Sequence, residues 1–210
     1  MQTTSLDLYD ILGIIAPGTV FLLGIAITFN AGILNKILVP QNLGYLGVYL
    51  ILAYVTGHLI QAIGNLVEYL YWTCWGGKPT NWPISRPESS NSPENIIEII
   101  SNITNQELPD DSKEREKTWK KMIAQTRSKI FKEGSPERLK KFNALYGMFR
   151  GLIASALVLL PFVWKSSQIN SYLAYYTLSL IIVFSSYRMH RFSQHYKKEL
   201  FASARDLHNS

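Results

Sequence analysis

Apolar residues occur in four long blocks along the chain, and a polar segment separates the second block from the third. The first block covers residues 11–29. The second covers 43–63, with its helix expected to continue to Trp72. The third covers 146–164 and the fourth 169–187. A helix of about 20 apolar residues crosses the roughly 30 Å of hydrocarbon in a bilayer. The pattern therefore predicts an all-α integral membrane protein with four transmembrane helices.

The polar middle segment also carries helical patterns. Residues 81–91 are rich in proline and serine and indicate a linker, and isoleucines then cluster at 96–103. Residues 111–132 place apolar side chains three and four apart, which indicates a helix with one apolar face. We therefore expect a helical insertion between the second and third transmembrane helices. The apolar face of its longer helix consists of Trp119, Met122, Ile123, Thr126 and Ile130.

The C-terminal tail, after Arg188, has the pattern of an amphipathic helix. Its apolar face could bind the membrane surface, a partner helix or further copies of the chain. Aromatic residues and leucines on this face favour self-association or docking on the middle segment over lipid binding. That face consists of Met189, Phe192, Tyr196, Leu200, Ala204 and Leu207.

The predicted segments are a transmembrane hairpin at 1–75, the helical insertion at 76–141, a second transmembrane hairpin at 142–188 and the amphipathic tail at 189–210.

Basic residues are distributed unevenly, and the formal net charge is +6. The links after the first and third blocks hold one lysine each, Lys36 and Lys165. Most other lysines and arginines lie between Lys78 and Lys141 or from Arg188 onward. Segments that flank membrane helices and carry excess lysine and arginine stay in the cytoplasm. We therefore expect a multi-pass protein of the inner, cytoplasmic membrane, with both termini and the middle segment in the cytoplasm.

The basic middle segment has a competing interpretation, which is contact with nucleic acid. Acidic residues alternate with the basic ones there, for example in KEREK at 113–117. This mixture is typical of a solvated helix face, whereas a surface that follows a phosphate backbone is predominantly basic. Nucleic acid is therefore not an expected partner.

A polar stripe crosses the second predicted transmembrane helix. Its residues lie three, four and three positions apart, so they share one side of a helix. Polar groups that face lipid are costly, so we expect the stripe to face the interior of the bundle, another subunit or water. A pore lining, proton relay or ligand site is one interpretation, and hydrogen bonding between packed helices is the other. The stripe consists of His58, Gln61, Asn65 and Glu68.

Four charged residues are predicted at similar depth, near the cytoplasmic ends of the transmembrane helices. Asp10 begins the first helix, Glu68 ends the second and Arg188 ends the fourth. Arg150 lies one turn into the third block, where a charge needs a partner, and Glu68 or Asp10 is at a compatible depth. We expect a collar of paired charges that stabilises the bundle, with a gate as the alternative.

Few residues suggest catalysis. Arg188 and His195 resemble in type and spacing the ribonuclease motif of HEPN domains, although an arginine at the end of a membrane helix also extends toward the interface. The sequence holds no phosphate-binding glycine loop, no zinc-type ligand spacing and no nucleophile elbow. We therefore expect no enzyme activity, no metal and no cofactor.

The stretch GHLIQAIGN at 57–65, followed by Glu68 and by GGKP at 76–79, resembles small prokaryotic membrane proteins of mostly unassigned role. In overall layout the chain also looks like compact membrane effectors of bacterial antiviral systems. Such proteins oligomerise and disturb the membrane when a cytoplasmic partner or signal engages them. The resemblance implies homo-oligomers and a cytoplasmic protein partner, and it assigns no functional residue.

Three functional hypotheses follow. The first is an oligomeric membrane effector or channel-like protein that responds to a cytoplasmic partner or signal, in prokaryotic antiviral defence as the resemblance implies. The second is a membrane anchor or adaptor that recruits a cytoplasmic protein without transport. The third and most remote is a membrane-tethered HEPN-like ribonuclease. All three share the lipid bilayer as a partner.

Overall fold

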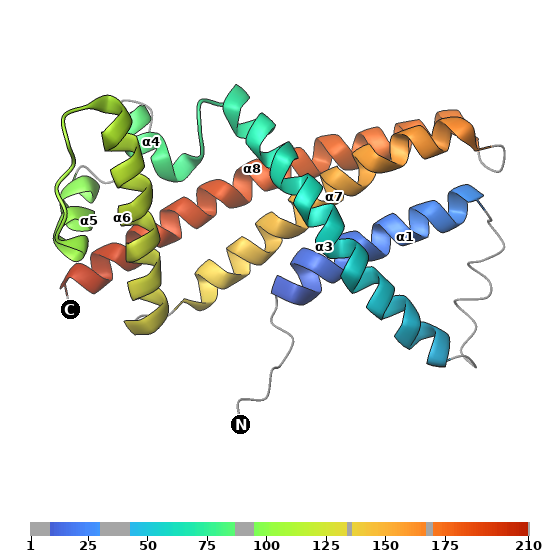
Figure 1. The fold of residues 1–210 in the computed structure, drawn as a ribbon, viewed down its shortest axis with the longest axis horizontal. Helices are drawn as coiled ribbons and strands as arrows, with labels where there is room; N and C mark the ends of the chain where they lie inside the picture. Colours follow the sequence, from blue (N-terminus) through green and yellow to red (C-terminus); the bar gives the residue numbers. More distant parts are fainter. Residues whose placement is uncertain (1–8, 30–42, 87–94, 134–135, 167–169, 210) are drawn as a thin grey trace. The chain divides into compact units, whose positions relative to one another are not determined.

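A computed structural model describes residues 9–29, 43–86, 95–133, 136–166 and 170–209, and within these ranges it contains helices and no strand (Figure 1). Lys36, residues 87–91 of the expected linker and position 169 lie outside these ranges. The elements in chain order are η1 (Asp10–Ile15), α1 (Ala16–Phe29), α3 (Leu43–Cys74), η2 (Pro79–Asn81), α4 (Trp82–Ser85), α5 (Ile96–Thr104), α6 (Ser112–Glu133), α7 (Glu137–Lys165) and α8 (Ser171–Asn209).

Three helical segments are long and apolar enough to span a membrane. They are Asp10–Phe29, Leu46–Cys74 and Glu137–Lys165. The fourth predicted span lies within α8, where tyrosine, serine and threonine interrupt the apolar run and lower its mean hydropathy. The chain is therefore a helical protein compatible with a membrane. The fourth span and the cytoplasmic position of the insertion stay predictions.

The chain divides into two compact units. The first unit comprises Met1–Leu70 and Asn143–Arg191, and the second comprises Tyr71–Phe142 and Phe192–Ser210. Both α7 and α8 run without a break across a unit boundary, so each helix contributes residues to both units. This grouping does not test the predicted division into two transmembrane hairpins, which stays a prediction.

Small residues allow the helices of the first unit to approach closely. A Cβ atom added to Gly18 of α1 would overlap the carbonyl oxygen of Ala53 and lie 2.7 Å from the amide nitrogen of Gly57, both on α3. A Cβ atom on Gly57 would overlap the carbonyl oxygen of Ile14. Backbone therefore meets backbone at this crossing, as is common where membrane helices pack through small residues.

Hydroxyl groups add hydrogen bonds between the helices of the first unit. Ser155 of α7 donates to the carbonyl oxygen of Pro17 at 3.1 Å, and Tyr49 of α3 donates to that of Thr19 at 3.0 Å. The accepting oxygens belong to backbone carbonyls inside α1. A side chain of a neighbouring helix can reach them only where the helices lie close together. An apolar cluster of α1, α7 and α8 completes the unit, with Ala156, Leu159, Val163 and Leu178 buried at its centre.

The second unit is held together by large apolar side chains. Trp119 and Met122 of α6 are fully buried, and α5 contributes four buried isoleucines. The apolar face predicted for α6 is confirmed, since four of its five members are buried and Ile123 packs against them. The C-terminal part of α8 docks on the middle segment, because its residues share the same core. The core consists of Ile96, Ile99, Ile100, Ile103, Trp119, Met122, Ile130, Leu139, Leu200, Phe201 and Ala204.

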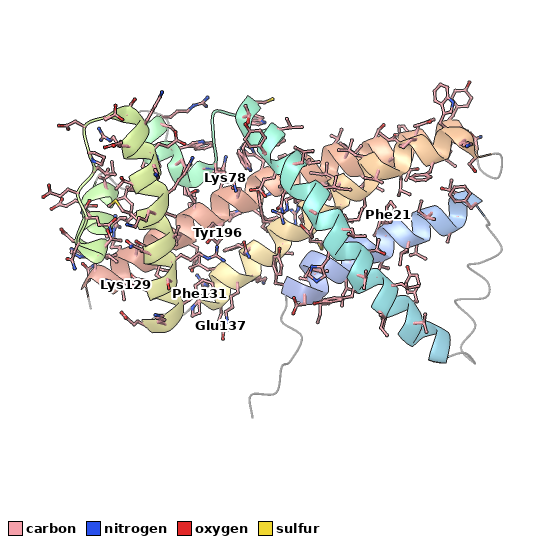
Figure 2. The ribbon with its side chains drawn as sticks, viewed as in Figure 1. Phe21, Lys78, Lys129, Phe131, Glu137 and Tyr196 are labelled. Carbon is pink, nitrogen blue, oxygen red and sulfur yellow. The ribbon has the colours of Figure 1, made fainter. Side chains whose placement is uncertain are left out.

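Charged residues cover the outside of the second unit. Figure 2 shows Lys129 and Phe131 at the end of α6, among side chains that end in nitrogen or oxygen. The ring of Phe131 lies 5.4 Å from the guanidinium carbon of Arg127 and 5.8 Å from the ammonium nitrogen of Lys140. Even an exposed aromatic ring of this unit is therefore paired with cations.

The linker predicted at 81–91 is wrong for its first five residues, which form the end of η2 and all of α4. Two tryptophans fix this segment. Trp119 of α6 donates its indole N–H to the carbonyl oxygen of Thr80 at 2.9 Å. Trp82 donates to that of Gly77 at 3.0 Å and lies 5.4 Å from the ammonium nitrogen of Lys197. Proline and serine content alone does not reveal these tertiary contacts.

Candidate functional site

A proline in α1 creates the first half of the candidate site. Pro17 has no amide hydrogen, so it cannot donate to the carbonyl of Gly13 four residues earlier. The helix accommodates this with the π-helical turn η1, in which the amide of Ala16 bonds the carbonyl of Ile11, five residues back. The side-chain amide of Gln61 on α3 donates to the Gly13 carbonyl. A side chain from another helix thus satisfies the oxygen that Pro17 leaves without its usual donor.

Gln61 connects three helical segments through one amide group. Its nitrogen also donates to the carbonyl oxygen of Gly147 on α7 at 2.8 Å. Its oxygen accepts from Arg150, at 3.0 Å from Nε and 2.6 Å from Nη2. A glutamine amide has two N–H donors and two acceptor lone pairs, so these four bonds use all of its capacity.

Arg150 and Glu68 complete the site with a buried ion pair. Nη1 of Arg150 bonds Oε2 of Glu68, and the two side chains are only 12% and 7% exposed. Gly64, one turn before Glu68, provides space, since a Cβ atom there would lie 3.3 Å from Cγ of Arg150. Removing one member of a buried ion pair leaves an uncompensated charge and costs about 3–5 kcal/mol. Gln61, Glu68 and Arg150, with the carbonyls of Gly13 and Gly147, are called the Gln61 hub below.

The predicted polar stripe divides into two pairs in the structure. Gln61 and Glu68 lie seven residues apart, are buried and belong to the hub. His58 and Asn65 also lie seven residues apart, but both are exposed on the surface of the single chain. The ring of His58 packs edge-on against Tyr54 of its own helix, with centroids 4.6 Å apart. The structure therefore brings two stripe residues into the interior of the chain and leaves the other two outside it.

The four charges of the predicted collar also have different surroundings. Of the two partners expected for Arg150, Glu68 forms the ion pair. Asp10 is the first residue of η1 and is half-buried. The guanidinium of Arg188 lies over the buried ring of Phe149, 5.7 Å from its centroid. The described contacts thus place two of the four charges in one ion pair.

The two residues of the suggested ribonuclease motif belong to different units. Arg188 lies in the first unit, over Phe149. His195 lies in the second unit, where its ring stacks on Phe142 with centroids 5.6 Å apart and planes 17° from parallel. These contacts give the ribonuclease hypothesis no support.

Sequence reasoning missed the backbone half of the hub. Gly13 and Gly147 contribute only carbonyl oxygens, which no residue type reveals. One signal was present, because Pro17 lies four residues after Gly13 and so frees that oxygen within an apolar block. A second was the spacing of Gly147, Gly151 and Ser155 at intervals of four, which is typical of close helix packing in membranes.

The hub can stabilise the bundle through its buried hydrogen bonds and ion pair. Within the described ranges, no three His, Cys, Asp or Glu side chains come close enough to hold a metal ion. Comparison with protein-family models, with curated proteins and with solved structures finds no match, so the functional proposal rests on the chain's own sequence and geometry.

Proposed function

We propose that this chain is a four-span membrane effector that assembles into oligomers and changes membrane permeability when a cytoplasmic partner or signal engages its second unit. Both termini and the second unit lie on the cytoplasmic side in this proposal, in agreement with the distribution of lysine and arginine. The inner membrane is its proposed location. A setting in antiviral defence rests on the resemblance alone.

Packing in the second unit supports the four-span topology. Leu200 of α8 shares one hydrophobic core with Ile100 of α5 and Trp119 of α6. The C-terminal part of α8 must therefore lie on the same side of the membrane as α5 and α6. If α7 crosses the membrane, as its length and composition allow, the chain has to return before Leu200. Among the residues that the structure describes between Lys165 and Leu200, the helix that can make this return is α8.

The Gln61 hub is the observation that carries the effector proposal. It joins η1, α3 and α7 through buried polar groups. Helices α3 and α7 each continue into the second unit, which contains residues 71–74 of α3 and 137–142 of α7. A change in the second unit can therefore reach the helices that the hub joins. Polar groups inside a membrane have few alternative partners, so such a hub favours discrete arrangements over gradual ones.

The test measures membrane potential in bacteria that express the chain, with a voltage-sensitive dye. Replacing Arg150 by Met leaves Glu68 buried without its cation. The resulting cost of about 3–5 kcal/mol is enough to shift a two-state equilibrium by more than about a hundredfold. We expect Arg150→Met to depolarise cells in the absence of any signal, without uptake of large dyes that report lysis.

Two further variants make this result specific. Arg138→Met removes an arginine whose side chain is 78% exposed and 4.0 Å from Glu199, and it should leave the potential intact. Arg150→Met combined with Glu68→Met removes both buried charges, which is often close to neutral for stability, and should largely restore the potential. If Arg150→Met enters the membrane in normal amounts and the potential is unchanged, the effector proposal is wrong.

A second candidate function is a non-transporting anchor or adaptor for a cytoplasmic protein. The separate hydrophobic core of the second unit favours it, because a folded module can serve as a docking surface without any change in the membrane. This alternative predicts an unchanged membrane potential in every hub variant. It also predicts that damage to the second unit alone removes the cellular phenotype.

A further inference from the structure

Charge is divided unevenly along α6. Residues 107–116, at the start of the helix and just before it, hold five acidic and two basic side chains. Residues 117–132 hold six basic side chains and no acidic one. The mixture of charges is thus confined to the first part of α6, and the end that leads into α7 is strongly basic. The six basic residues are Lys117, Lys120, Lys121, Arg127, Lys129 and Lys132.

Lys120 and Lys129 have acceptors of their own within the chain. The ammonium nitrogen of Lys120 lies 2.6 Å from Oε1 of Glu116, one turn earlier on the same helix. The ammonium of Lys129 donates to the carbonyl oxygen of Ile103, in the last turn of α5. These two cations therefore contribute to the fold of the second unit itself.

Arg127 and Lys140 have no such acceptor, and both lie against the ring of Phe131 at the end of α6 (Figure 2). The ring is 36% exposed, and both cations are exposed. Among the residues that the structure describes, neither cation lies within 4.0 Å of a carboxylate, although Glu133 and Glu137 are near in the sequence. Two cations that share one exposed ring without a counter-charge produce a positive potential that attracts an anion. Arg127, Phe131 and Lys140 are called the Phe131 cluster below.

We propose that the Phe131 cluster binds the phosphate headgroups of anionic phospholipids and holds the second unit against the membrane surface. A guanidinium matches two phosphate oxygens with parallel hydrogen bonds, and an ammonium supplies a second positive charge. Aromatic rings are favoured where headgroups meet hydrocarbon. The inference rests on the proposed function for the membrane-spanning role of α7, and it adds a lipid class that the second unit recognises.

The position of Lys140 on α7 favours a lipid over a soluble anion. Helix α7 is continuous from Glu137 to Lys165, and the apolar block in it begins at Tyr146. At 1.5 Å per residue, Lys140 lies about 9 Å before that block. Headgroups extend about 5–8 Å beyond the hydrocarbon, so a lysine side chain can reach them. Tethering by α7 gives these headgroups a far higher effective concentration than a free phosphate has.

The experiment uses the full-length chain in nanodiscs of phosphatidylcholine with an increasing fraction of phosphatidylglycerol. The single cysteine is replaced by Cys74→Ser, and Ser128→Cys, beside Arg127 on an exposed position of α6, carries a fluorescent dye. A small, constant fraction of phosphatidylcholine with a nitroxide on its headgroup quenches the dye when α6 lies at the headgroups. We expect quenching to rise with the phosphatidylglycerol fraction.

A matched pair of double variants separates the cluster from net charge. Each basic residue near an anionic surface contributes about fivefold to binding. Arg127→Gln with Lys140→Gln should therefore raise the phosphatidylglycerol fraction at half-maximal quenching at least about tenfold. Lys113→Gln with Arg115→Gln removes the same charge from exposed positions at the acidic end of α6, and should change that fraction less than about twofold.

A third variant tests the ring. Phe131→Leu keeps every charge and an apolar side chain but removes the aromatic face that both cations share. We expect it to raise the half-maximal fraction about threefold, because each cation–π contact is weak at an exposed site.

Three outcomes would overturn the proposal. Quenching that does not depend on phosphatidylglycerol would remove the lipid, and equal effects of the two double variants would reduce the cluster to net charge. Loss of quenching on addition of millimolar glycerol 3-phosphate would assign the cluster to a soluble anion. Nanodiscs carry no membrane potential and present headgroups on both faces, so this result does not depend on effector activity. An unchanged potential in Arg150→Met would refute the effector proposal alone.

Discussion

The two units of the chain reverse each other's arrangement of apolar and polar groups. The first unit places glycine, alanine and a buried ion pair between its helices and exposes large apolar side chains such as Leu59 and Phe184. The second buries Trp119 and isoleucines and exposes charges. Burying apolar surface stabilises a fold only where the alternative is water. In hydrocarbon, close backbone packing and internal hydrogen bonds have to hold helices together instead.

Glycine at the crossing of α1 and α3 gives the largest expected effect. Gly57→Leu would place a side chain where the backbone of Ile14 lies, and backbone cannot move aside as a flexible side chain can. We expect a loss of more than about 4 kcal/mol in the free energy of unfolding of the first unit. Thermal unfolding and size-exclusion profiles in detergent measure this loss.

Gly47→Leu is the matched control for this experiment, because a Cβ atom added at Gly47 meets nothing within 4 Å. It makes the same chemical change on the same helix and should leave the profile unchanged. If both variants behave alike, close backbone packing is not what holds the first unit together, and the comparison of the two units fails.

A large-to-small substitution in the second unit gives the next largest effect. Trp119→Ala removes a fully buried side chain and the indole bond to Thr80, and should cost about 3–5 kcal/mol. Hydrogen exchange of the full-length chain in detergent should show faster exchange in α5 and α6. Trp75→Ala removes an exposed tryptophan of the same unit and should change little. Equal acceleration in α1 and α3 would show that the two units do not have separate cores.

Much of this helical arrangement could be predicted from hydrophobic periodicity. The helix expected at 111–132 is observed at Ser112–Glu133, and the second apolar block does continue as one helix, as far as Cys74. Periodicity succeeds here because each helix has its own apolar pattern, whatever its neighbours are. Docking of the C-terminal part of α8 was one of two favoured outcomes for its aromatic face.

The hub could be predicted only in part, because Gly13 and Gly147 contribute only backbone carbonyls to it. The sequence places Gln61 and Glu68 on one side of a helix and gives Arg150 a compatible depth. The sequence does not show that Gln61 and Glu68 are buried while His58 and Asn65 are exposed, because all four lie on the same side of one helix. That separation depends on where Gly57 meets Gly18, which is a tertiary contact. The Gly13 carbonyl likewise receives its side-chain donor from another helix, α3.

The smallest expected effect concerns a polar atom in the apolar core of the second unit. The hydroxyl of Thr126 is buried and has no hydrogen-bond partner among the residues that the structure describes. Thr126→Val replaces it with a methyl group of similar size and should raise the free energy of unfolding of this unit by about 1 kcal/mol. Denaturant-dependent hydrogen exchange of α6 measures the change. Thr104→Val is the control, because the Thr104 hydroxyl donates to the carbonyl oxygen of Ile100 at 2.7 Å and its loss should not stabilise the unit. A decrease in stability for Thr126→Val would mean that this hydroxyl stabilises the core of the second unit. The contrast between an apolar core in the second unit and polar contacts in the first would then be smaller.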